Sequence, residues 1–93
     1  MKLTDRQFVS FYILQEQIYL EHLRQMKKWG VQSHTPSEWL MFITEELGEL
    51  SQAISEYEYR HGSIEKVIRE AIQTATLSLK VAEMYMFQKE VKK

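Results

Sequence analysis

Apolar residues in the middle of the chain recur at alternating intervals of three and four positions, the periodicity of one face of an α-helix. This row consists of Leu40, Ile43, Leu47, Leu50, Ile54 and Tyr57. Directly before it, Thr35-Pro36-Ser37-Glu38 has the pattern of a helix start, with Thr as the N-cap, Pro in the first turn and Glu at the third position. His61-Gly62 predicts the end of this helix. The row is therefore predicted to be the core seam of one long helix.

Two further helices are expected on either side of this one. The first begins at Thr4, where Gln7 completes a capping box, and continues to Trp29, with Gly30 as the residue that ends it. The third begins after Ser63. Its main seam is Ile64, Ile68, Ala71, Ala75, Leu79, Ala82 and Met86. Roughly opposite lies a second row, polar at first and then apolar: Lys66, Glu70, Gln73, Leu77, Lys80, Val81 and Met84.

Three long helices with apolar residues on more than one side predict an all-α bundle that another copy of the chain completes. We expect a single domain over residues 1–93, assembled as a homodimer or homotetramer. A formal net charge of −1 gives no basic surface for nucleic acid, and no stretch is apolar enough to cross a membrane. The first residues have no signal-peptide pattern, which favours a cytoplasmic protein. With no cysteine, disulfide bonds and thiolate metal sites are excluded.

Acidic residues gather in Glu45-Glu46-Leu47-Gly48-Glu49, inside the middle helix. Glu46 and Glu49 are three positions apart and therefore share a face, beside the apolar seam. A second polar group, Lys66, Glu70 and Gln73, has helical spacing in the third helix. Two such helices can direct four oxygen-bearing side chains to one point, where oxygen ligands favour Mg²⁺, Mn²⁺ or Ca²⁺. The simpler alternative is a solvated acidic face.

The ordered set Glu45-Glu46-x-x-Glu49 followed by Glu70-x-x-Gln73 resembles the EExxE…ExxD signature of the MazG-like, all-α nucleoside triphosphate pyrophosphohydrolases. Upstream, the segment from Arg24 to His34 and the pair Trp39-Leu40 are similar to small stand-alone MazG-like proteins, many of them from phages and bacteria. The resemblance covers about residues 18 to 84.

This resemblance implies Mg²⁺-dependent cleavage of a nucleoside triphosphate, often a deoxynucleotide, between the α and β phosphates. The products would be a nucleoside monophosphate and pyrophosphate, and Mn²⁺ could replace Mg²⁺. The implied metal ligands are Glu46, Glu49, Glu70 and Gln73. Glu45 would be an outer-sphere partner of the metal or would position water, and Lys66 would contact phosphate. Both are candidate catalytic residues with Glu46. The implied substrate-binding residues are Lys28, Trp29, His34, Trp39 and Lys66.

Gln73 departs from the family pattern, which has Asp at this position. An amide oxygen can still bind a hard cation, but it brings no charge. The departure keeps a second function open: a helical oligomer that binds metal and nucleotide with little or no turnover. A third possibility is a purely structural oligomer with solvated glutamates. For single residues the simpler roles are packing for Trp29 and Trp39, a surface position for His34 and an ion pair with Glu70 for Lys66.

Overall fold

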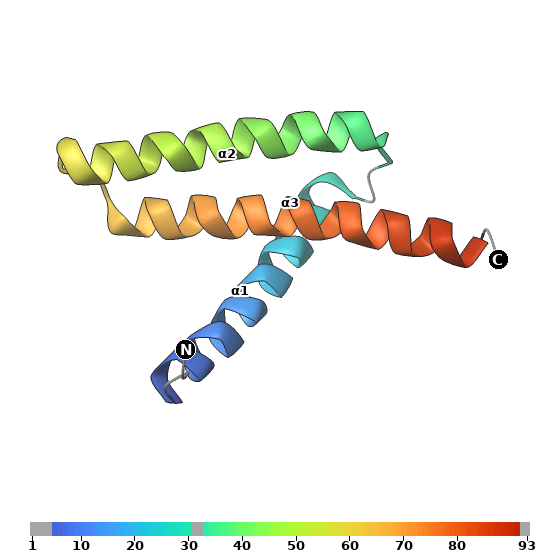
Figure 1. Cartoon of the computed structure of the whole chain (residues 1–93), viewed down its shortest axis with the longest axis horizontal. Helices are drawn as coiled ribbons and strands as arrows, with labels where there is room; N and C mark the ends of the chain where they lie inside the picture. The colour runs from blue at the N-terminus through green and yellow to red at the C-terminus, as the bar shows by residue number, and fades with distance from the viewer. Residues whose placement is uncertain (1–4, 31–32, 92–93) are drawn as a thin grey trace.

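A computed structural model of the chain describes residues 5–30 and 33–91, and these form three α-helices without a strand (Figure 1). They are α1 (Asp5–Trp29), α2 (Pro36–Tyr59) and α3 (Ile64–Val91). The all-α prediction is therefore confirmed. The predicted cap at Thr4, and the side chains of residues 5–9, lie outside what the structure describes. None of the described helices combines the length and the hydropathy that crossing a membrane requires.

The start of α2 follows from local hydrogen bonds. The backbone nitrogen of Glu38 donates to Thr35 Oγ1 at 3.2 Å, and the backbone nitrogen of Thr35 donates to Glu38 Oε1 at 2.9 Å. These two bonds form the predicted capping box, which satisfies backbone donors that the first turn leaves free. Before it, α1 ends at Gly30, whose φ of 72° is the left-handed conformation that glycine adopts without strain.

The turn between α2 and α3 lies at the predicted position. His61 has a φ of 57°, and the backbone nitrogen of Gly62 donates to the carbonyl of Glu56 at 2.9 Å. A Cβ at position 62 would lie 2.9 Å from the backbone of Glu56, so only glycine fits this close approach. Ser63 then caps α3 by accepting a hydrogen bond from the backbone nitrogen of Lys66 at 3.2 Å.

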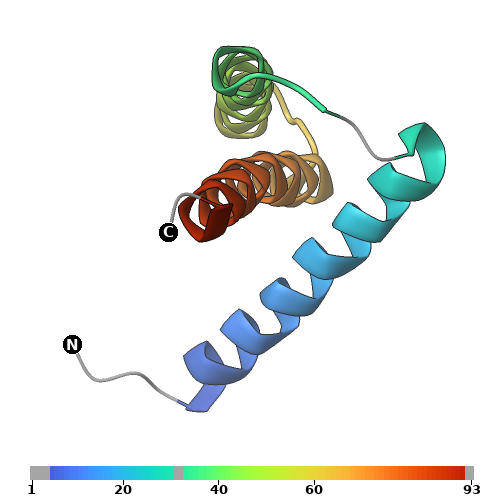
Figure 2. The ribbon, with the colours of Figure 1, turned by 90° about the vertical axis from the view of Figure 1, so that its right-hand side faces the viewer.

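Helices α2 and α3 lie side by side and antiparallel, whereas α1 packs only against α3 and projects away from the pair (Figures 1 and 2). The pairing of α2 with α3 buries Trp39 and Ala53 from α2 and Glu70 from α3, and Thr76 of α3 is also buried. Leu50 and Leu77 are half-buried in the same layer. This contact places the middle of α2 opposite the first half of α3.

The main apolar seams, predicted as core seams of a bundle that another copy completes, are largely uncovered within one chain. Leu40 and Leu47 of the α2 seam are 63% and 54% exposed, and Ile68 and Leu79 of the α3 seam are 49% and 54% exposed. The helices face each other instead through the neighbouring row of α2, which contains Glu46 and Ala53, and the second row of α3. Both main seams therefore remain open at the surface of a single chain.

The single chain is also more extended than a folded monomer of its size. Its Cα radius of gyration is 15.6 Å, against about 12 Å for a compact domain of this length. It exposes 7860 Å², about 2,200 Å² more than a folded monomer of this mass. Much of the excess comes from large apolar side chains, including Phe11 and Tyr12 on the projecting part of α1, which are 63% and 68% exposed.

Candidate metal centre and adjoining cleft

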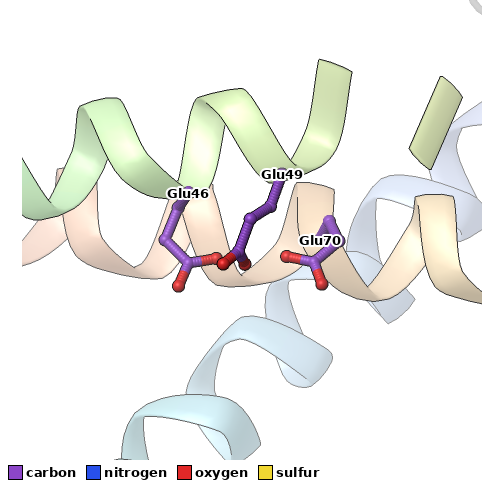
Figure 3. Close-up of side chains that lie close together, drawn as sticks. All are labelled: Glu46, Glu49 and Glu70. Carbon is purple, nitrogen blue, oxygen red and sulfur yellow. The ribbon is translucent and has the colours of Figure 1, made fainter. Parts of the chain in front are cut away.

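Three carboxylates meet in the middle of the contact between α2 and α3 (Figure 3). Glu46 and Glu49 come from adjacent turns of α2, and Glu70 reaches toward them from α3. One oxygen from each lies within 4.8 Å of the others. Glu70 is buried, Glu46 is half-buried and Glu49 is exposed, so the cluster extends from the helix contact to the surface. The structure thus brings together the three glutamates predicted as metal ligands.

The proximity of these side chains makes it costly to ionise Glu46. Desolvation by burial, followed by the charge of Glu49 and by interaction with Glu70, raises the pKa of Glu46 to about 7. A divalent cation would remove the same repulsion without a proton.

Gln73 lies one turn beyond Glu70 and also faces the cluster. With its amide nitrogen turned toward the carboxylates, it donates to Glu70 Oε2 at 3.2 Å and to Glu46 Oε2 at 3.3 Å. In this orientation Gln73 stabilises the negative charge as a hydrogen-bond donor. Rotation of the amide by half a turn would present its oxygen instead, as the predicted ligand role requires.

Among the described residues, no lysine, arginine or histidine forms an ion pair with Glu46, Glu49 or Glu70. Lys66, predicted to contact phosphate, has its Nζ 3.6 Å from Glu56 Oε2, at the turn between α2 and α3. It is not among the residues that line the cleft described below. Its role in phosphate binding stays a prediction.

A cleft of about 540 Å³ adjoins the carboxylate cluster, and Glu45 and Glu46 form part of its wall. The end of α1, the first half of α2 and the second half of α3 enclose it. The remaining lining residues are His22, Gln25, Met26, Trp29, Gly30, Ser33, His34, Trp39, Phe42, Leu77, Lys80, Glu83, Met84 and Phe87. Aromatic and apolar walls with a few polar groups are typical of sites for small organic ligands.

The predicted substrate-binding residues are distributed unevenly around this cleft. His34 and Trp39 meet edge to face, with ring centroids 4.9 Å apart, and His34 meets Phe42 at 5.0 Å. Trp29 lines the cleft and remains 50% exposed, so part of its ring is accessible. Lys28 does not line the cleft. Its Nζ lies over the Trp29 ring, 4.8 Å from the centroid.

Five polar residues of the cleft were not among the predicted site residues: His22, Gln25, Ser33, Lys80 and Glu83. Gln25 is buried, and its amide nitrogen donates to Glu21 Oε1 at 3.0 Å. Lys80 is half-buried, with its Nζ 5.9 Å from the centroid of the Trp39 ring. Burial lowers the pKa of Lys80, while the charges of Glu83 and Glu21 act in the opposite direction. The spacing of Lys80 after Glu70, Gln73 and Leu77 was the signal in the sequence that it shares their face.

Comparisons with protein-family models, with curated proteins and with solved structures found no match for this chain.

Proposed function

We propose that this chain is a Mg²⁺-dependent nucleoside triphosphate pyrophosphohydrolase that works as a homo-oligomer. The observation that carries the proposal is the convergence of Glu46, Glu49 and Glu70 at one edge of an aromatic cleft. This arrangement supports a metal-bound phosphate chain beside a pocket large enough for a nucleoside. The resemblance of the sequence to the MazG-like signature supplies the reaction type.

The donor set fits a hard divalent cation. Ligands on opposite sides of Mg²⁺ are about 4.2 Å apart, because each Mg–O bond is about 2.1 Å. The carboxylate oxygens lie within 4.8 Å of one another, so movements of a few tenths of an ångström in flexible side chains would bring them into range. Mn²⁺ has similar ligand preferences.

When bound, Mg²⁺ would supply charge neutralisation for phosphate oxygens and would make a bound water more acidic. Glu46, Glu49 and Glu70 would hold the ion between α2 and α3, leaving positions open toward the cleft. Glu45 lines the cleft directly beside Glu46, and its carboxylate would orient the attacking water and accept a proton from it. The exposed ring of Trp29 and the buried ring of Trp39 would form apolar walls for the nucleoside.

The open surface of the single chain supports the oligomer. An excess of about 2,200 Å² per chain is in the range that permanent homodimers bury. The exposed seams of α2 and α3 would supply the apolar core of that contact, which would turn two helix pairs into a four-helix bundle. This packing would leave Glu46 and Glu49, which belong to the other row of α2, outside the contact between subunits.

Hydrolysis is tested with a panel of deoxynucleoside and ribonucleoside triphosphates in Mg²⁺ or Mn²⁺, with pyrophosphate and orthophosphate measured separately. The expected products are pyrophosphate and a nucleoside monophosphate, with no early orthophosphate. Glu46→Gln and Glu70→Gln should each abolish turnover and leave the helical circular dichroism unchanged. Glu58→Gln, on the exposed surface near the end of α2, is the matched control. Absence of pyrophosphate with every nucleotide, or full activity in both cluster variants, would refute the hydrolase proposal.

Gln73 favours a second candidate function, a metal- and nucleotide-binding oligomer without efficient turnover. A neutral amide stands where the MazG-like signature has a carboxylate, and here it donates to Glu70 and Glu46. This function predicts that Mg²⁺ raises the melting temperature of the wild type and that nucleotides bind, while no pyrophosphate is released. The product assay and a thermal shift on the same sample separate the two functions.

A further inference from the structure

We infer that Lys80 selects the base of the bound nucleotide by the group at C4 of a pyrimidine or C6 of a purine, favouring the carbonyl oxygen of uracil, thymine and guanine over the amino group of cytosine and adenine. This inference rests on the proposed function in one respect: the cleft beside the carboxylates must be the nucleotide site. It adds a specificity-determining residue that the EExxE…ExxD pattern does not contain.

The position of Lys80 along α3 places it at the base end of the cleft. Ten residues separate it from Glu70, which corresponds to about 15 Å along the helix axis. A phosphate chain held at the carboxylate cluster therefore leaves Lys80 beside the far part of the ligand. There its ammonium group lies 5.9 Å from the centroid of the Trp39 ring, on the wall that a flat heterocycle would contact.

The hydrogen-bonding chemistry of Lys80 explains which bases it would accept. An ammonium group has three donors and no acceptor. It can therefore donate to O4 of uracil or thymine and to O6 of guanine, but it meets a second donor at the amino group of cytosine or adenine. In an enclosed site, a donor that faces another donor loses the partner it had in water, so the mismatch lowers affinity.

Gln25 complements this selection from the α1 side of the cleft. Its amide nitrogen is engaged by Glu21 at 3.0 Å, which leaves the amide oxygen as its remaining acceptor. Lys80 interacts electrostatically with the same Glu21, so Gln25 and Lys80 lie toward one part of the cleft. A donor next to an acceptor matches the carbonyl and ring N–H that are adjacent in uracil, thymine and guanine.

Lys80 is also available for a ligand. Within the described part of the chain, no carboxylate lies within ion-pair distance of its Nζ, although Glu83 and Glu21 are near enough to act on its charge. Lys66 differs, because Glu56 already holds it at 3.6 Å outside the cleft. Lys89, exposed on α3 outside the cleft and without a predicted role in the site, is the matched control for Lys80.

The test measures equilibrium binding of five monophosphates, dUMP, dTMP, dGMP, dCMP and dAMP, with Mg²⁺ present, by quenching of tryptophan fluorescence and by calorimetry. The wild type should bind the first three about tenfold more tightly than the last two. Lys80→Met, which keeps most of the unbranched side chain and removes the ammonium group, should reduce this ratio to about one. Lys80→Arg should retain the ratio, and Lys89→Met, on the exposed end of α3 outside the cleft, should leave all five affinities unchanged.

Three results would overturn the assignment: no base preference in the wild type, no binding of any monophosphate at millimolar concentration, or an equal loss for all five ligands in Lys80→Met. The last result would identify Lys80 as a phosphate contact. Pyrophosphate release by the same proteins keeps the two proposals apart. Turnover without a base preference overturns the role of Lys80 alone, and a base preference without turnover overturns the hydrolase alone.

Discussion

Replacing Glu46 by Gln should stabilise the metal-free protein while removing its capacity to bind metal. Glu46 carries a pKa of about 7 instead of the ordinary 4.5, because burial and the charges of Glu49 and Glu70 oppose its ionisation. At 1.36 kcal/mol per pKa unit this corresponds to about 3 kcal/mol when the carboxyl is forced to ionise. Partial exposure screens the interaction, so about 1.5 kcal/mol remains as the expected cost of the charge.

The sign of this effect fixes the pH at which it is visible. A carboxyl whose folded-state pKa is raised contributes stability that is complete below its unfolded pKa of about 4.5 and lost as pH rises through about 7. The wild type should therefore be less stable at pH 8 than at pH 5. Glutamine has nearly the same shape and no charge, so Glu46→Gln should lack this dependence. At pH 8 in EDTA its free energy of unfolding should be higher by about 1.5 kcal/mol, or roughly 6 °C or more in Tm.

Urea and thermal unfolding of both proteins, at pH 5 and pH 8 and at one protein concentration, measure the difference. Adding Mg²⁺ at pH 8 should stabilise the wild type and leave the stability of Glu46→Gln unchanged. The difference in free energy of unfolding between the two proteins should therefore narrow or change sign. Glu45→Gln, the adjacent exposed residue, is the matched control and should change stability by less than about 0.5 kcal/mol. A variant no more stable than the wild type at pH 8 in EDTA would refute the electrostatic account of the cluster.

Gln73→Asp should destabilise the metal-free protein, because two hydrogen bonds are exchanged for a fourth carboxylate, and it should tighten Mg²⁺ binding about tenfold. Calorimetric titration measures the Mg²⁺ affinity, with Gln88→Asp at an exposed position of α3 as the control. An unchanged Mg²⁺ affinity would contradict the ligand role of Gln73. Because Glu46 holds a proton below a pH of about 7, the Mg²⁺ affinity should fall toward pH 6, and Mg²⁺ binding there should release about one proton. Calorimetric titration in buffers of different ionisation enthalpy measures the number of protons released. Light scattering should find a dimer or tetramer for the wild type. Leu47→Glu, on the exposed α2 seam, should reduce the oligomer to smaller assemblies or monomers, whereas Tyr59→Glu at the end of α2 should not. A stable wild-type monomer at micromolar concentration would contradict the proposed assembly.

The ends of the helices could be predicted from the sequence because their causes are local. The capping box at Thr35 and Glu38 depends on residues three positions apart, and the close approach at Gly62 depends on the turn that precedes it. The carboxylate cluster was also predictable. Glu46 and Glu49 share one face of α2, so a third ligand from an antiparallel helix only has to lie on the face of that helix that meets α2. The spacing of Glu70 and Gln73 predicted that both lie on one face of α3.

The choice between helix faces could not be predicted from periodicity. Both α2 and α3 have two usable faces, and a repeat of 3.6 residues does not specify which face meets the helix of the same chain. The larger apolar rows were predicted as core seams without an assigned partner helix, and within one chain Leu47 and Leu79 are exposed while Ala53 and Glu70 are buried. The partner of Lys66 was missed for a related reason, because Glu56 approaches it from the other helix across the turn.

The exposed seams of α2 and α3 have a consequence for how much of this protein a cell must make. In the proposed oligomer these apolar side chains would be covered by another copy, so the chain would gain part of its folding free energy from association and its stability would rise with its own concentration. Newly made chains at low abundance would then be the ones that proteases remove. The cell would then need to exceed a threshold concentration of this chain. Below it little folded protein accumulates, and above it the folded protein persists.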